Sequence, residues 1–209
     1  MELLKIKVCG MTDMQQVEQL AAMGADYAGF IFYEKSPRFA GNKLAAADLK
    51  GFASIQKVGV FVNESVDVIL QTVDEYGLNA VQLHGDETAD FCSGIKGKVT
   101  VIKAFRVKGD EDLSEILKPY EKAADYFLFD TKAQEYGGTG KKFDWSVLSK
   151  GNITKPYFLS GGIGMDDMEQ VKQFTLTNNV FALDVNSKFE TAPGTKDMES
   201  VKKFLRGIK

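Results

Sequence analysis

Eight apolar segments rich in β-branched and aromatic residues alternate along the chain with eight segments of helical periodicity. This alternation restricts the fold more than any other feature of the sequence. Parallel strands need a long crossover between them, usually a helix, so the pattern predicts a parallel sheet covered by helices. The predicted strands are Leu4–Val8, Tyr27–Phe32, Lys57–Val62, Ala80–Leu83, Val99–Phe105, Tyr126–Phe129, Tyr157–Leu159 and Val180–Leu183. The predicted helices are Met14–Met23, Lys43–Phe52, Val66–Tyr76, Thr88–Ile95, Asp112–Glu121, Trp145–Ser149, Asp166–Phe174 and Asp197–Leu205.

The same alternation occurs in closed barrels and in open, doubly wound sheets. The turn after the first predicted strand, Cys9-Gly10-Met11-Thr12, lacks the G-x-G-x-x-G pattern of a dinucleotide-binding site. No Pro-rich or Ser-rich linker divides the chain. We therefore predict one α/β domain, a single (β/α)8 TIM barrel that spans residues 1–209.

The charge balance argues against a polyanionic partner. The chain has 209 residues, with 26 Lys and Arg against 29 Asp and Glu, which gives a net charge of -3. No global positive field is therefore available to hold nucleic acid. No signal-like apolar segment opens the sequence, and no run of about 18 apolar residues occurs in it. We expect no membrane association and a cytoplasmic location.

Cysteine and histidine usage restricts the possible cofactors. Cys9 and Cys92 are too few for a disulfide framework and have no metal-ligand spacing, which favours a reducing compartment. His84 is the single histidine, so the chain cannot build a metal site that needs two imidazoles. With no dinucleotide or nucleoside-triphosphate motif either, we expect an enzyme that uses neither metal nor cofactor.

In barrels of this class the active site lies at the carboxyl ends of the strands. Gly161 and Gly162 follow the seventh predicted strand, and Asn186 and Ser187 follow the eighth. Loops at these two places commonly bind phosphate, because glycine amides can approach phosphate oxygens closely. A Gly-Gly pair on its own is more often a tight turn, so the placement carries the prediction.

A second glycine-rich segment, Gly137–Lys141, follows the sixth predicted strand and includes Gly138 and Gly140. Its glycine density suits a phosphate loop. The spacing differs from G-x-x-x-x-G-K-[ST], so a nucleoside triphosphate site is not predicted. A mobile loop is the alternative interpretation.

Cys9 is the best candidate for a reactive group. It is expected to end the first strand, with Lys7 two residues earlier on the same face. A nearby cation favours the thiolate, so we expect Lys7 to lower the pKa of Cys9. A strand-end cysteine is otherwise a small buried hydrophobe, and that is what we expect of Cys92 inside the fourth helix.

Further polar side chains follow the other predicted strands. The planar guanidinium of Arg38 suits a substrate carboxylate, although it could be a surface charge. Asp130 and Asp184 could be catalytic acids or could cap the loops that follow them. A lone histidine such as His84 is more often a packed residue than a catalyst. We expect substrate contacts from Arg38, Gln82, His84 and Asp184.

Taken in order, these segments form a recognisable set. Each is weak alone, but the set is specific and covers nearly the whole chain, from residue 7 to residue 197. The chain resembles the phosphoribosylanthranilate isomerase family of tryptophan biosynthesis. The matching segments are Lys7-Val8-Cys9-Gly10-Met11-Thr12, Ser36-Pro37-Arg38, Gln82-Leu83-His84-Gly85, Phe129-Asp130-Thr131, Gly137-Gly138-Thr139-Gly140, Ser160-Gly161-Gly162-Ile163, Leu183-Asp184-Val185-Asn186-Ser187 and Pro193-Gly194-Thr195-Lys196-Asp197.

The resemblance implies an Amadori rearrangement of N-(5-phosphoribosyl)anthranilate to 1-(2-carboxyphenylamino)-1-deoxyribulose 5-phosphate. It implies that Cys9 is the general base at C2 of the sugar and that Asp130 is the general acid at the ring oxygen. It also implies that Arg38 holds the anthranilate carboxylate. Phosphate contacts are expected from Gly138, Gly140, Gly161, Gly162, Asn186 and Ser187.

Three other functions are open to a barrel of this kind. Indole-glycerol-phosphate synthase relies on a lysine acid and glutamates, and the sugar-phosphate isomerase of histidine biosynthesis relies on two aspartates without a counterpart of Cys9. A barrel that only senses phosphate ligands would have no need of Cys9 and Asp130. Lys188 stands where the family often has a small residue, so its role is open. The expected partner is a small-molecule substrate, and association with other pathway enzymes is not predictable.

Overall fold

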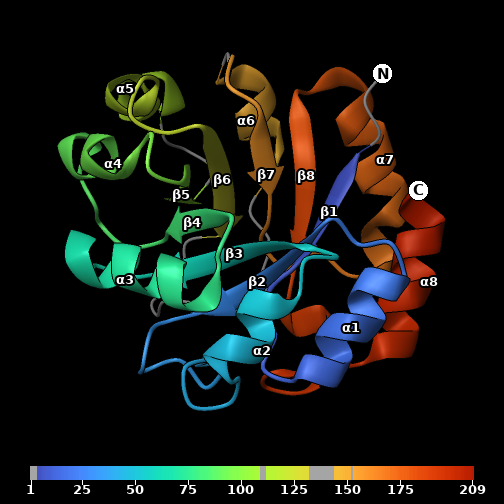
Figure 1. Ribbon diagram of the computed structural model, residues 1–209. Helices are drawn as coiled ribbons and strands as arrows, with labels where there is room; N and C mark the ends of the chain where they lie inside the picture. The colour runs from blue at the N-terminus through green and yellow to red at the C-terminus, as the bar shows by residue number, and fades with distance from the viewer. Residues whose placement is uncertain (1–3, 109–111, 132–143, 152) are drawn as a thin grey trace.

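The computed structural model describes residues 4–108, 112–131, 144–151 and 153–209. Eight parallel strands form a closed barrel in chain order, and the last strand pairs with the first (Figure 1). The predicted TIM barrel is therefore confirmed. The strands are β1 (Lys5–Val8), β2 (Tyr27–Ile31), β3 (Gln56–Phe61), β4 (Ala80–Leu83), β5 (Thr100–Val107), β6 (Tyr126–Thr131), β7 (Tyr157–Leu159) and β8 (Val180–Val185).

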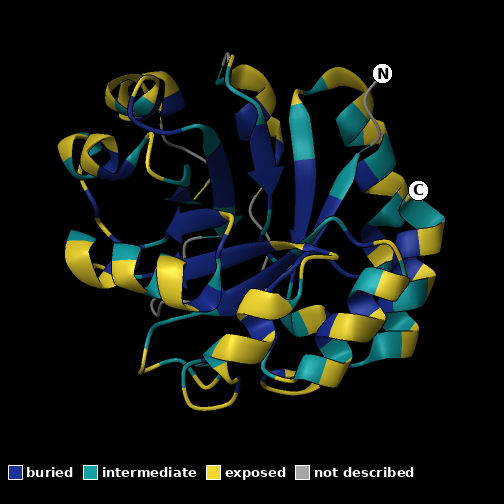
Figure 2. Cartoon of the chain, in the orientation of Figure 1, coloured by how far each residue is buried: buried dark blue, intermediate teal, exposed yellow. Residues whose placement is uncertain are grey.

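One α-helix follows each barrel strand, and the helices stand around the outside of the barrel (Figure 1). Their inner faces are buried and their outer faces are exposed (Figure 2). The helices are α1 (Met14–Ala22), α2 (Ala46–Gly51), α3 (Val66–Tyr76), α4 (Ala89–Ile95), α5 (Leu113–Leu117), α6 (Ser146–Lys150), α7 (Met168–Thr177) and α8 (Met198–Ile208). Short 3₁₀ turns lie at Lys118–Tyr120, Met165–Asp167 and Ser187–Phe189.

The buried side chains form two apolar clusters. The larger cluster lies between the strands and the helices, where each fully buried Leu, Ile or Phe stabilises the fold by about 1.5–3 kcal/mol. The smaller cluster fills the barrel interior, because alternate residues of each strand face inward. The inner cluster consists of Val58, Ala80, Ile102, Ala104, Leu128, Phe158 and Ala182.

Polar residues replace this apolar packing toward the carboxyl ends of the strands. Along a strand, the residue two positions after an inner-cluster residue points to the same face of the sheet. Ala80, Leu128 and Ala182 are followed at this spacing by Gln82, Asp130 and Asp184. The strand pattern therefore places these three polar side chains in one layer at one end of the barrel.

Two strands that carry candidate residues extend further than predicted. β6 runs to Thr131 and β8 runs to Val185, so Asp130 and Asp184 lie inside strands. The predicted strands are too short because, in the sequence alone, a charged residue indicates the start of a loop. The end of a barrel strand can hold an ion pair or line a polar cavity, and in this barrel it does both.

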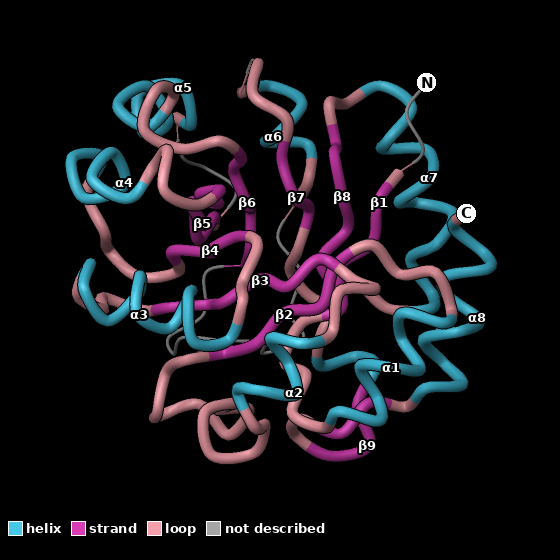
Figure 3. Tube along the Cα trace, in the orientation of Figure 1, coloured by secondary structure: helices cyan, strands magenta, loops and turns pink. Residues whose placement is uncertain are grey.

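A small hairpin after β8 was not predicted. Its strands, β9 (Glu190–Ala192) and β10 (Thr195–Lys196), pair antiparallel and lie near α1 (Figure 3). The side chain of Gln16 on α1 donates to the carbonyl of Lys196 and accepts from its amide, at 2.9 Å in both cases. The hairpin is thus fixed against α1.

Candidate active site

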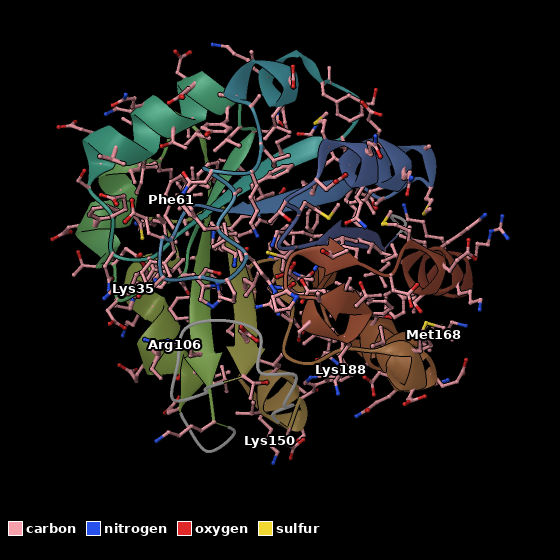
Figure 4. All side chains as sticks on the ribbon, turned by 90° about the horizontal axis from the view of Figure 1, so that it is seen from below. Lys35, Phe61, Arg106, Lys150, Met168 and Lys188 are labelled. Carbon is pink, nitrogen blue, oxygen red and sulfur yellow. The ribbon has the colours of Figure 1, made fainter. Side chains whose placement is uncertain are left out.

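A cavity of about 680 Å³, its opening to solvent included, lies at the carboxyl ends of the strands. Figure 4 is viewed from this end, and Lys35, Arg106 and Lys188 lie around it. Most of the predicted site residues meet here. The lining residues are Cys9, Ile31, Tyr33, Ser36, Val60, Val62, Gln82, His84, Asp130, Ser160, Gly161, Gly162, Ile163, Asp184, Asn186, Ser187 and Lys188.

Lys7 is buried behind two of the lining residues, Gln82 and Asp184. Its side chain is fully buried, and its Nζ lies 2.8 Å from Asp184 Oδ1 and 2.8 Å from Gln82 Oε1. Burial alone would lower the pKa of Lys7, but the Asp184 carboxylate and the Cys9 side chain outweigh burial, and the pKa is raised. Lys7 is therefore a charged ammonium in contact with the residues of the site.

Cys9 is buried beside Lys7 and reaches the cavity from β1. A Cβ atom on Gly29 of β2 would lie 2.8 Å from its Sγ, so only glycine leaves room for the sulfur. Burial raises the pKa of the Cys9 thiol, and the cations of Lys7 and Lys196 offset this effect only in part. Lys7 lowers this pKa, as predicted, but desolvation of the thiolate outweighs its attraction, so the net shift is upward.

Asp130 reaches the cavity from β6, three strands away from Cys9 around the barrel. Its Oδ1 accepts a hydrogen bond from the Thr131 amide at 2.8 Å, and its Oδ2 lies 3.4 Å from His84 Nε2. The other ring nitrogen of His84 lies 2.7 Å from Gln82 Nε2. The carboxyl group is thus held between a backbone amide and an imidazole.

Arg38 is not among the lining residues and is held by the hairpin. Its Nε bonds with both carboxylate oxygens of Glu190, at 2.9 Å and 3.0 Å, and its Nη2 lies 2.6 Å from Glu190 Oε2. Lys196 Nζ lies 2.8 Å from Glu190 Oε1 and 2.7 Å from Asn186 Oδ1. Glu190 was not predicted as a site residue, and Lys196 was named only within a matching segment, since neither follows a barrel strand directly.

The glycine pair after β7 and the turn after β8 lie on one side of the cavity. Gly161 has φ of +94°, and a Cβ atom there would lie 2.5 Å from Thr131 Oγ1. Gly161, Gly162, Asn186 and Ser187 all line the cavity, as does Lys188. Gly138 and Gly140 lie outside the described residues.

Two further predictions concern ions and membranes. Among residues 4–108, 112–131, 144–151 and 153–209, no group of three or more His, Cys, Asp or Glu side chains is placed to hold a metal ion. Within the same ranges, no helix has the length and apolar character needed to cross a membrane. Cys92 is buried in α4, away from the cavity lining, as predicted.

The chain is similar in sequence and in fold to characterised proteins. Residues 6–207 match the family model of N-(5'phosphoribosyl)anthranilate (PRA) isomerase. The N-(5'-phosphoribosyl)anthranilate isomerase of Parabacteroides distasonis is 40% identical over 208 residues, which cover 97% of this chain and 92% of the relative.

Two solved structures extend the comparison. Phosphoribosyl anthranilate isomerase from Thermotoga maritima has a TM-score of 0.84 and 36% identity, covering 99% of this chain and 98% of the other. A phosphoribosyl anthranilate isomerase in complex with reduced 1-(o-carboxyphenylamino)-1-deoxyribulose 5-phosphate has a TM-score of 0.81 and 32% identity at the same coverage. The chain therefore belongs to the N-(5'-phosphoribosyl)anthranilate isomerase family.

Proposed function

We propose that the cavity converts N-(5-phosphoribosyl)anthranilate into 1-(2-carboxyphenylamino)-1-deoxyribulose 5-phosphate with Cys9 as general base and Asp130 as general acid. The reaction is the isomerase step of tryptophan biosynthesis, the activity of the family to which the chain belongs. The observation that carries the assignment is that both side chains line one cavity from strands three places apart. Opening the sugar ring needs an acid at the ring oxygen, and forming the enolamine needs a base at the neighbouring C2.

The proton transfers divide between the two groups. Asp130 gives its proton to the ring oxygen, which breaks the bond from C1 to that oxygen and leaves an iminium between C1 and the anthranilate nitrogen. Cys9, as thiolate, then takes the proton from C2, and the electrons move to form the enolamine, which tautomerises to the ketone product. Lys7 and Lys196 are the cations whose attraction favours the Cys9 thiolate.

We assign the two charged ends of the substrate to two different sets of residues. Glu190 engages Nε and Nη2 of Arg38 and orients the guanidinium, and Nη1 is the donor that we assign to the anthranilate carboxylate. The phosphate is assigned to the amides of Gly161 and Gly162 and to the Asn186 and Ser187 turn, which line the cavity. Gly138 and Gly140 stay predictions. Gln82, His84 and Asp184 also line the cavity, and we assign them contacts with the rest of the substrate.

The acid and base are both protein side chains, so we propose that the reaction needs no metal ion. We expect activity to be unchanged after dialysis against EDTA and unchanged on addition of Mg²⁺ or Zn²⁺. Loss of activity in EDTA, restored by one of these ions, would contradict the proposal. Both cysteines are free thiols, which supports a reducing cytoplasmic location.

The decisive test follows the fluorescence of freshly prepared phosphoribosylanthranilate as the purified protein consumes it. Each proton-transfer group contributes about 10²–10⁴-fold in rate, so Cys9→Ala and Asp130→Asn should each lower kcat by a factor in that range. Cys92→Ala removes the other buried thiol, which lies in α4, and should retain activity. An inactive wild-type chain whose melting temperature still rises with phosphate esters would leave only a phosphate-binding barrel.

A further inference from the structure

Lys7, Gln82, His84 and Asp130 form one row of polar contacts across the cavity. Lys7 Nζ lies 2.8 Å from Gln82 Oε1, and Gln82 Nε2 lies 2.7 Å from His84 Nδ1. His84 Nε2 lies 3.4 Å from Asp130 Oδ2. Lys7 and Gln82 are buried, with 0% and 1% exposure, so water does not compete for their contact.

The chemistry of each group fixes the direction of every contact in this row. An ammonium has only donors, so the end of Gln82 that faces Lys7 must be its carbonyl oxygen. The amide nitrogen of Gln82 therefore faces His84, and because that nitrogen only donates, Nδ1 of His84 must accept. A neutral imidazole has one accepting nitrogen and one N–H, so the proton lies on Nε2, which faces Asp130.

We infer that Gln82 is a positioning residue: its carboxamide, oriented by Lys7, holds His84 as the Nε2–H tautomer, which presents an N–H group to Asp130. The opposite tautomer would set a lone pair of Nε2 against a carboxylate oxygen. The N–H instead stabilises the carboxylate that Asp130 becomes after it protonates the substrate. A contact of 3.4 Å is long for a hydrogen bond, and contacts of this kind shorten when substrate is bound.

Lys7 also connects the base to the acid. The ammonium of Lys7 interacts with the side chain of Cys9 as well as with Asp184 and Gln82. One buried cation thus favours the charged form of Cys9 and, through Gln82 and His84, orients the hydrogen-bond donor of Asp130. The catalytic part of this inference rests on the proposed function, whereas the tautomer of His84 does not.

The tautomer can be read directly, because His84 is the single histidine of the chain. Protein labelled with ¹⁵N-histidine should give one imidazole pattern in a long-range ¹H–¹⁵N spectrum in alkaline buffer, with the proton on Nε2. Gln82→Glu keeps the shape and the contact with Lys7 but turns an acceptor toward Nδ1, so the proton should move to Nδ1. Gln82→Met removes both polar atoms and should leave a mixture of tautomers.

Kinetics separate positioning from simple substrate binding. Groups that fix the tautomer of a functional histidine are worth about 10- to 100-fold, so Gln82→Glu should lower kcat by a factor in that range with KM little changed. Gln173→Glu adds the same charge on the exposed face of α7 and should change neither the spectrum nor kcat.

A wild-type Nδ1–H tautomer, or an Nε2–H tautomer that persists in Gln82→Glu, would overturn the inference. A rise in KM alone, with kcat unchanged, would make Gln82 a binding contact and overturn its positioning role. An inactive wild type with the expected tautomer would reject the proposed function and leave the assignment of His84 intact.

Discussion

At the scale of single residues, the site depends on charges that are buried and shared. The ammonium of Lys7 contacts the carboxylate of Asp184 and the carboxamide of Gln82 and interacts with the thiol of Cys9. No single one of these contacts determines its role. The protonation state of the Cys9 thiol depends on two opposing effects: burial raises its pKa, and the cations of Lys7 and Lys196 lower it. Reactivity of Cys9 should therefore respond to the removal of either cation.

The pH dependence of Cys9 follows from the direction of its pKa shift. Because burial raises this pKa, the thiolate forms only as the pH rises, and kcat/KM should still be increasing above neutral pH. Lys7→Met removes an attraction that lowers the pKa, so alkylation of Cys9 should need a still higher pH. The measurement is the rate of iodoacetamide modification against pH in a Cys92→Ala background. An unchanged profile would show that Lys7 does not influence the thiol.

Gly161 gives a second prediction at this scale. Its positive φ and its close approach to Thr131 both oppose a side chain, so Gly161→Ala should lose about 1–3 kcal/mol of stability and raise KM for the phosphorylated substrate. Gly97→Ala is a matched control, since its φ is +89° and nothing lies within 4 Å of the added Cβ. Urea unfolding and KM are measured for both variants. Equal losses of stability, with KM unchanged in both, would mean that the contact with Thr131 has no effect.

At the scale of elements, the sequence predicted the barrel units better than their ends. α3 has the predicted bounds Val66–Tyr76, because Ser65 caps its first turn and Gly77 ends it in the left-handed conformation. The fifth helix is shorter than predicted, since Pro119 lies where the α-helix gives way to a 3₁₀ turn. Single residues such as these set the helix ends, whereas the apolar periodicity that predicts a unit does not mark where it stops.

The parts of the site that escaped prediction depend on contacts distant in sequence. Arg38 was predicted from its own loop, but its partner Glu190 is 152 residues away, in strands of three and two residues with no periodicity to detect. The contact of Gln82 with Lys7 spans 75 residues. Such pairs become visible only when the barrel closes and brings its strand ends together.

The hairpin supports a prediction of its own. Glu190 lies between Arg38 and Lys196, and its bonds with them hold its pKa below the usual range, even though burial opposes this effect. Glu190→Gln should free the guanidinium and raise KM about 10-fold, the cost of losing one charged hydrogen bond, with a smaller effect on kcat. Thr191→Ala, on the exposed part of β9, is the control. A normal KM for Glu190→Gln would remove the hairpin from substrate binding.

At the scale of the whole molecule, barrel closure and catalysis use the same ion pair. β8 closes the sheet against β1, and Lys7 and Asp184 are register partners across this junction. Their side chains are 0% and 6% exposed and lie 2.8 Å apart. A buried pair of this kind repays its desolvation only with good geometry, so its presence is weak evidence that stability requires it.

Substitutions at both positions separate the structural role of the pair from its catalytic role. Asp184→Asn leaves the Lys7 ammonium buried without its counter-charge and should cost about 3–5 kcal/mol in urea unfolding. Lys7→Met combined with Asp184→Leu replaces the pair by apolar side chains of similar size, and such replacements are often neutral or stabilising. We expect the double variant to fold with near wild-type stability and to lose isomerase activity. If instead the double variant is as unstable as Asp184→Asn, the pair is needed for closing the barrel. Recovery of stability without activity would mean that the pair serves the chemistry of Cys9 and Asp130. Apolar contacts at this position would then be sufficient to close the barrel.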